Sequence, residues 1–155
     1  MDAQKRTMRI RVAVILAIAG VVALIEPRLS IPLMQSVKYH AFLLDEGAPT
    51  KGDYVNFEVR NRVIDLDKAV TLTKRVACVA GERLEFRDEE HFCDGRPLGR
   101  VFLRTGKGIP LHAFAWNGPV PENKVFLSGD HPRSFDSRYF GFVEIASLQK
   151  LTPLF

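Results

Sequence analysis

The sequence predicts a mostly antiparallel β-sheet domain that follows one N-terminal membrane-anchor helix. Three observations favour this fold class. Residues 54–59 alternate between apolar and polar side chains, which places Val55, Phe57 and Val59 on one face of a strand. The chain has 11 glycines and 9 prolines, which suit the turns between short strands. An uncharged, apolar run at residues 12–25 precedes the strands.

The composition limits the classes of partner. At 155 residues, the chain fits one domain with a sizeable core. The formal net charge is only +4 and the basic residues are scattered except at the N-terminus, so we expect no nucleic-acid partner. The four histidines do not stand at metal-ligand spacing with the two cysteines, so we expect no metal and no other cofactor. The composition makes no prediction of the oligomeric state.

Residues 1–27 are predicted to be a basic N-terminus and membrane anchor, and residues 28–155 an exported domain. The 14 uncharged residues 12–25 would extend about 21 Å as a helix, short of the roughly 30 Å hydrocarbon core. Arg9 and Arg11 can lengthen the span if their side chains reach the headgroups. A signal peptide cleaved near Val22-Ala23 is the alternative. We expect an uncleaved anchor whose basic flank stays in the cytoplasm.

The strands are predicted from short apolar runs between turn residues. We expect strands at 42–44 and 54–59, with a turn at 45–52 between them. After a polar connection at 61–68, the next strand is expected over 69–80. Residues 84–87 and 91–93 are expected to form a hairpin, and 120–127 a turn and a short strand. The segment 101–119 receives no assignment.

Lys74 is the most informative residue of the strand predicted at 69–80. Strand alternation places it on an apolar face, where burying an ammonium group is costly. Such a lysine finds a carboxylate or loses its proton, and a neutral lysine can act as the general base for a serine hydroxyl. The alternative is a lysine that extends from the strand end into solvent. The residues expected to share its face are Val70, Leu72, Val76 and Cys78.

A polar loop at residues 129–141 carries Ser134, Asp136 and Arg138 within five positions. A hydroxyl, an acid and a base this close together favour a fixed hydrogen-bond network, although a solvated surface hairpin is the alternative. The loop resembles the last signature box of the type I signal peptidases, G-D-N-x-x-x-S-x-D-S-R-x-x-G. It differs in having His131 for Asn and one residue fewer before Ser134.

Two further segments resemble boxes of the same family. Residues 74–82 resemble K-R-V-x-G-x-P-G-D, with Ala80 in place of the proline, and residues 51–55 resemble the earlier G-D-x-V strand. The three boxes follow the family's order. The chain is therefore identified as a member of the signal peptidase I superfamily, and its last box is similar to the TraF-type branch, whose peptidases mature conjugative pilins.

This resemblance implies a membrane-anchored serine endopeptidase that uses a Ser-Lys dyad. Lys74 matches the general base, and Ser134 matches the serine that orients the lysine amine. Asp136 matches an acid that supports the site through ion pairs with Arg75 and Arg138. No substrate-binding residue is predicted.

Two serines compete for the role of nucleophile. Ser30-Ile31-Pro32 copies the start of the TraF-type motif S-x-P-x-G-x-Y, but it stands too far before Lys51-Gly52. Ser36 keeps an aromatic residue six positions on and a suitable distance to Gly52, although it lacks the proline and the glycine. We predict Ser36 as the nucleophile, with Ser30 as the alternative. The backbone N–H of Ser36 would be the main oxyanion donor.

The resemblance also implies a substrate and a compartment. The expected substrate is a prepilin or another exported precursor, processed on the periplasmic face of the bacterial inner membrane. In TraF-type enzymes, an acyl-enzyme can also be resolved by an amine, which joins the pilin ends into a ring. The alternative function is a non-catalytic assembly factor of a transfer or secretion apparatus, which the degraded nucleophile box favours.

The two cysteines lie on short strands that are expected to be neighbours. In an oxidising compartment, Cys78 and Cys93 can therefore form a disulfide. The alternative is that Cys78 is a buried free thiol on the face of the lysine.

Overall fold

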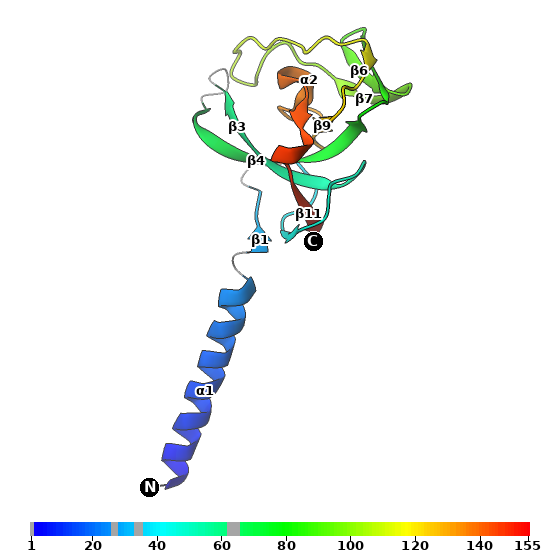
Figure 1. Ribbon diagram of the computed structural model, residues 1–155. Helices are drawn as coiled ribbons and strands as arrows, with labels where there is room; N and C mark the ends of the chain where they lie inside the picture. Colours follow the sequence, from blue (N-terminus) through cyan, green and yellow to red (C-terminus); the bar gives the residue numbers. More distant parts are fainter. Residues whose placement is uncertain (1, 26–27, 33–35, 62–65) are drawn as a thin grey trace.

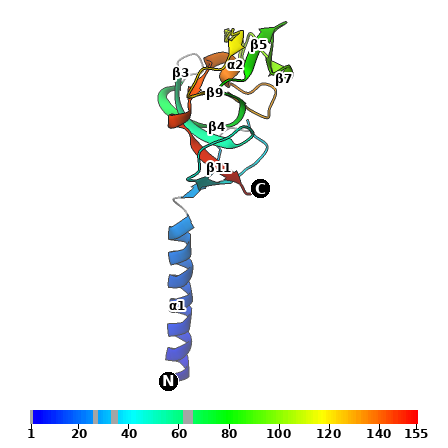
Figure 2. The same cartoon turned by 45° about the vertical axis from the view of Figure 1, so that its right-hand side comes forward.

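A computed structural model describes residues 2–25, 28–32, 36–61 and 66–155 of the chain (Figure 1). A long helix, α1 (Asp2–Ile25), is followed by a part that consists almost entirely of β-strands. Both views show α1 extending away from the strands (Figure 2). Among the residues described, no helix combines the length and the apolar content that crossing a membrane requires.

The strands form two antiparallel sheets, which confirms the predicted mostly β fold class. The larger sheet has seven strands in the order β1-β2-β11-β3-β4-β9-β10, and the smaller has four in the order β7-β6-β5-β8. The strands of the larger sheet are β1 (Leu29–Ser30), β2 (Phe42–Asp45), β3 (Tyr54–Asn61), β4 (Leu66–Val79), β9 (Lys124–Ser128), β10 (Val143–Glu144) and β11 (Gln149–Pro153). Those of the smaller are β5 (Arg83–Arg87), β6 (Glu90–Cys93), β7 (Arg96–Arg100) and β8 (Gly118–Pro119). The helical turns α2 (Ser137–Phe140) and η3 (Ile145–Ser147) complete the fold.

The predicted strands and the hairpin are found close to their expected positions. β4 begins earlier than expected, because Leu66 already pairs with Asn61 of β3. The rest of the predicted connection, residues 62–65, lies outside the described residues. Asp88 and Glu89 both have positive φ angles, of 50° and 60°, and they close the hairpin of β5 and β6. This is the backbone conformation of the tight turns that join twisted antiparallel strands.

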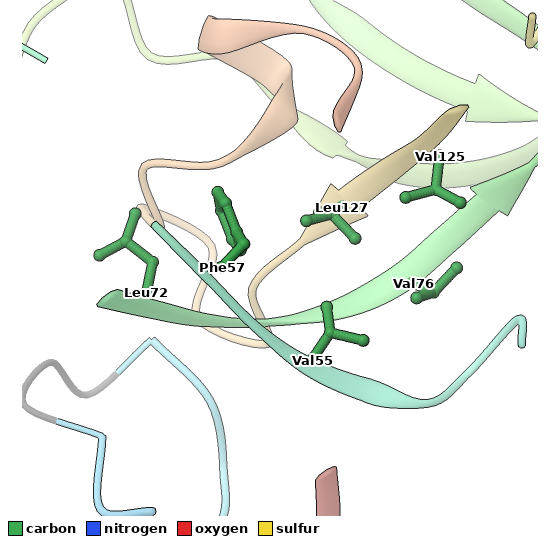
Figure 3. Packing of buried hydrophobic residues seen from close by; sticks show 6 residues of the cluster. All are labelled: Val55, Phe57, Leu72, Val76, Val125 and Leu127. Carbon is green, nitrogen blue, oxygen red and sulfur yellow. The ribbon is translucent and has the colours of Figure 1, made fainter. Parts of the chain in front are cut away.

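The main core lies on one face of β3, β4 and β9 (Figure 3). Burying a Val, Leu or Phe side chain fully contributes about 1.5–3 kcal/mol, so this cluster is a main source of stability. Lys74 lies between two of its members along β4, and directly across from Val55 on β3. The buried residues of the cluster are Val55, Phe57, Leu72, Val76, Val125 and Leu127.

A β-bulge at Ala77 changes the face on which Cys78 lies. Val76 pairs with Leu127 of β9, and Cys78 pairs with the adjacent Phe126, so Ala77 has no partner of its own. The extra residue reverses the alternation of β4. The prediction that Cys78 shares the face of Lys74 is therefore wrong, because after the bulge it is Val79, and not Cys78, that packs against the cluster of Val76.

The reversal turns Cys78 toward the smaller sheet. There it forms a disulfide with Cys93 of β6, with a Cα–Cα distance of 5.8 Å. The predicted disulfide is confirmed, and the alternative of a free Cys78 thiol is excluded. The bond joins the strand that carries Lys74 to the smaller sheet.

Candidate active site

The site is centred on the contact between Lys74 and Ser36. Lys74 pairs with Val55 of β3 in the middle of β4, a strand that has β9 on its other side, and the lysine is 1% exposed. Its Nζ donates a hydrogen bond of 2.6 Å to Oγ of Ser36, which lies in the turn before β2. This distance allows a proton to pass between the hydroxyl and the amine.

Burial lowers the pKa of Lys74 from 10.5 to about 8. Desolvation is the largest cause, because the folded protein stabilises the charged ammonium less well than water does. Asp136 favours the charged form and Arg138 opposes it. A substantial fraction of the Lys74 side chains is therefore neutral at mildly alkaline pH, where a free lysine would be charged.

The segment that carries Ser36 is held against the loop after β9. The backbone N–H of His131 donates to the carbonyl oxygen of Ser36 at 3.2 Å, and that of Lys38 donates to Oδ2 of Asp130 at 3.0 Å. The hydroxyl of Tyr54 also donates to Oδ2 of Asp130, at 2.8 Å. Asp130 thus connects the serine segment, β3 and the polar loop. Sequence reasoning assigned it no role, although it belongs to the Gly-Asp pair that opens the last signature box.

Ser30 lies on the opposite face of the sheet. Its Oγ accepts a hydrogen bond of 2.7 Å from Nδ2 of Asn56, whose Oδ1 accepts one of 2.7 Å from Thr73. Thr73 and Lys74 are consecutive in β4, so their side chains point to opposite faces. The structure therefore brings Ser36 to the lysine, and it does not bring Ser30 there.

Asp136 and Arg138 form a buried bidentate ion pair. Nε and Nη2 of Arg138 each donate to one carboxylate oxygen of Asp136 at 2.8 Å, and the two side chains are 2% and 0% exposed. Nη1 of Arg138 donates to the carbonyl oxygens of Arg100 and Pro132. The second oxygen of Asp136 also accepts from the backbone N–H of Gly129, at 2.9 Å. These bonds fix the polar loop against β7 and β9.

Arg75 does not join this ion pair. Its Nε lies 3.5 Å from Oδ1 of Asp130, and the side chain is 46% exposed. Because Arg75 follows Lys74 in the strand, it points to the other face of the sheet, away from Asp136. The expected pair between Arg75 and Asp136 is therefore replaced by one between Arg75 and Asp130.

Ser134 is buried in the site but does not bond to the lysine. Within the described part of the chain, its Oγ has no hydrogen-bond partner, so the expected bond to Lys74 is not formed in this structure. Ser134 packs instead against Gly129, whose Cα also approaches the carbonyl oxygen of Ser36. A Cβ at position 129 would lie 2.7 Å from that oxygen and 2.5 Å from Cβ of Ser134. Only glycine fits between the two serines.

One group of side chains has the composition of a metal site. Cys78, Glu82 and Cys93 have their ligand atoms within 4.8 Å of one another. Both sulfur atoms are joined in the disulfide, however, so neither cysteine offers the thiolate that binds a metal ion. The disulfide instead links the two sheets covalently.

One protein-family model matches almost the whole chain. The model described as signal peptidase, peptidase S26, matches residues 4–151. This range contains every predicted site residue and both sheets, apart from the last residues of β11.

Curated relatives match over shorter segments. A probable conjugal transfer protein TraF from Sinorhizobium fredii is 39% identical over 79 residues, which cover 50% of this chain and 41% of that protein. A conjugal transfer protein TraF from Agrobacterium tumefaciens is 39% identical over 87 residues, which cover 54% and 48%. Signal peptidase I V of Bacillus subtilis is 31% identical over 81 residues, which cover 45% and 48%. The chain thus spans less than half the length of these relatives.

Among solved structures, a signal peptidase I from Enterococcus faecalis is similar to this chain. The superposition has a TM-score of 0.44 at 26% identity, and it covers 70% of this chain and 99% of the other.

Proposed function

Because the chain belongs to the signal peptidase family, peptidase S26, we propose that it is a membrane-anchored serine endopeptidase with a Ser36–Lys74 dyad. The observation that carries this proposal is the 2.6 Å contact between the Ser36 hydroxyl and a buried lysine amine. Lys74 is fully enclosed and its pKa is lowered to about 8, so a neutral amine is accessible. Both features are needed for a lysine that removes a proton from serine.

In the first step, neutral Lys74 accepts the proton of the Ser36 hydroxyl as Oγ attacks the scissile carbonyl carbon. The negative charge that develops on the carbonyl oxygen is stabilised by backbone N–H groups, with that of Ser36 as the main donor. The ammonium of Lys74 then donates its proton to the departing amine. The peptide C–N bond breaks, and the acyl group remains on Ser36 as an ester.

In the second step, a water molecule attacks the ester. Lys74, neutral again, accepts a proton from this water and returns it to Oγ of Ser36, which releases the new carboxylate end. An amine in place of water would give a new peptide bond, which is the reaction that closes a pilin into a ring. The same base serves both reactions, so the outcome depends on which nucleophile reaches the ester.

We propose a conjugative prepilin as the precursor, with processing on the periplasmic side of the inner membrane. The similarity to conjugal transfer proteins named TraF supports the substrate. The disulfide supports an oxidising compartment. Large apolar side chains between Met8 and Val22 are exposed along α1, so the helix offers an apolar surface to lipid. Because its uncharged run is short, Arg9 and Arg11 would have to extend to the headgroups.

Incubating the purified full chain with a candidate prepilin tests the proposal. We expect cleavage by the wild type, and loss of cleavage in Ser36→Ala and in Lys74→Arg, since a guanidinium group does not release its proton. The kcat/KM of the wild type should rise with pH, with an apparent pKa of about 8 as the neutral amine forms.

Ser30→Ala is the matched control, because it also removes one serine hydroxyl but on the far face of the sheet. It should keep nearly full activity. Activity that depends on Ser30 and not on Ser36 would move the nucleophile to Ser30. Cleavage that survives both changes would refute the serine mechanism, and a folded wild type that never cleaves would favour a non-catalytic assembly factor.

A further inference from the structure

A second candidate site lies on the outer side of the polar loop. It is a cavity of about 160 Å³. For comparison, an engineered apolar protein cavity of about 150 Å³ binds one benzene molecule. The cavity therefore has room for one side chain the size of Phe or Leu. Its apolar walls come from Phe102, Leu111, Phe135 and Tyr139.

The walls of this cavity are ordered by hydrogen bonds. Residues 103–111 form an arm in which the N–H of Leu111 donates to the carbonyl of Leu103 at 2.9 Å, and that of Thr105 to Ile109 at 2.8 Å. The hydroxyl of Tyr139 accepts from the N–H of Phe102 at 3.0 Å, which joins the arm to α2. A site whose walls are already in place loses little conformational freedom on binding.

Two arginines at the cavity favour a negatively charged ligand. Arg104 and Arg133 line it and both are exposed, and none of the described residues that line it carries a carboxylate. Within the described residues, neither forms an ion pair: Arg104 donates to the carbonyl of Gly108 at 3.0 Å, and the guanidinium of Arg133 lies 4.5 Å from the centre of the Phe102 ring. Guanidinium groups without an acidic partner are well suited to bind a carboxylate.

The loop at residues 129–141 both lines the cavity and holds the segment of Ser36. Ser134 and Asp136 point inward and are buried, whereas the alternating neighbours Arg133 and Phe135 line the cavity. A peptide held there thus contacts the outer side of the segment whose inner side, at Ser134, lies against Gly129, and Gly129 in turn lies beside the carbonyl oxygen of Ser36. This position is suited to a part of the substrate outside the scissile bond.

We propose that this cavity is an exosite for the precursor. It takes one aromatic or leucine-sized side chain of the precursor, and Arg104 and Arg133 bind acidic side chains beside it. The assignment of the ligand as the substrate rests on the proposed peptidase function, whereas the binding of acidic, apolar peptides does not.

Calorimetric titration of the full chain carrying Ser36→Ala tests binding without cleavage. The probe is the acetylated and amidated peptide Gly-Glu-Phe-Glu-Gly, beside one version with Gln for both Glu and another with Ala for Phe. We expect the acidic Phe peptide to bind, and each altered peptide to bind at least about tenfold more weakly, as loss of charged hydrogen bonds or of the buried ring predicts. Equal affinity for the three peptides, or no binding at about 1 mM, would overturn the exosite.

Substitutions at the cavity give the second arm. Arg133→Gln and Arg104→Gln should each weaken the acidic peptide about tenfold. Arg96→Gln, at an exposed arginine of β7 that does not line the cavity, should leave its affinity unchanged. Both cavity arginines are exposed, so their loss does not threaten folding. An equal effect of all three changes would show that only general charge attracts the peptide, and would refute the site.

Precursor cleavage by the active chain gives the third arm. Arg133→Gln should raise KM for a precursor with an acidic, apolar segment and leave kcat unchanged. An unchanged KM would refute the precursor as the ligand. Charge-dependent peptide binding without any cleavage would instead support the cavity as a peptide-binding site and refute the peptidase function. The two failures are therefore distinguishable.

Discussion

Replacing Lys74 by methionine should give a folded, inactive protein that is more stable than the wild type at neutral pH. The fall of the Lys74 pKa from 10.5 to about 8 corresponds to about 3 kcal/mol of free energy. This free energy is a cost of folding that is fully present below pH 8, because there the ammonium is solvated in the unfolded chain and buried in the folded one. Losing the hydrogen bond to Ser36 offsets about 1 kcal/mol of the gain. We therefore expect Lys74→Met to raise the free energy of unfolding by about 2 kcal/mol at pH 7.

The sign of the effect should change with pH. Between pH 8 and 10.5, the unfolded wild type binds more protons than the folded wild type, so wild-type stability rises with pH in this range. Above 10.5 the cost is gone, and the variant should be less stable by about 1 kcal/mol, the value of the lost hydrogen bond. Comparing the variant with the wild type removes the titration of all other groups.

Urea unfolding of both proteins at pH 7 and at pH 10.5 measures this difference. Lys107→Met is the matched control, because Lys107 is exposed on the arm at 103–111 and its replacement should leave the free energy of unfolding nearly unchanged. A Lys74→Met variant that is less stable than the wild type at pH 7 would show that the folded protein stabilises the ammonium. That result would refute Lys74 as a base that is easily made neutral.

Three further predictions concern the surroundings of the dyad. Gly129→Ala should lower kcat/KM about a hundredfold and leave the circular dichroism spectrum unchanged, because its Cβ would lie 2.7 Å from the carbonyl oxygen of Ser36 and displace the nucleophile. Gly20→Ala is the control, because a Cβ there meets no atom within 4 Å. Equal activity of the two variants would contradict the argument. Replacing Cys78 and Cys93 by alanine should lower the free energy of unfolding in urea by about 3 kcal/mol, because the disulfide closes a loop with a sequence separation of 15. Reducing the wild type should give the same loss, and unchanged stability would exclude a role of the bond in folding. Protease added to intact spheroplasts should degrade the β-strand part of the chain, whereas protection until the membrane is lysed would contradict the proposed topology.

Period-two alternation predicted the central strands because each has one face in the core. It placed Lys74 on the face of Leu72 and Val76, where the structure has it. It failed at Cys78 because a bulge depends on the pairing of β4 with β9, which no local pattern of residues records. β11 was missed for another reason: it has one buried apolar residue, Leu151, and a proline at its end, so its signal is weak.

The site residues divide in a similar way. The signature boxes named Lys74, Ser134, Asp136 and Arg138, but not all of the partners that these side chains have in the structure. Arg75 pairs with Asp130 rather than Asp136, because the face of a strand decides which loop residue it can reach. Ser30 bonds to Asn56 across the sheet and does not meet Lys74, which no pattern around Ser30 indicates. These contacts are long-range, and a single sequence contains no information about which of several compatible side chains will meet.

The buried ion pair has a consequence for the proposed base. A lone Asp136 carboxylate near Lys74 would favour the ammonium and raise the pKa of the lysine. Arg138 binds both oxygens of that carboxylate and, by its own charge, lowers the pKa of Lys74, so the two influences oppose each other. Desolvation then determines the direction of the shift. The Asp136–Arg138 pair therefore does more than fix the loop. Because Arg138 is the counterion of the buried carboxylate, Asp136 lies close to Lys74 without keeping the lysine charged.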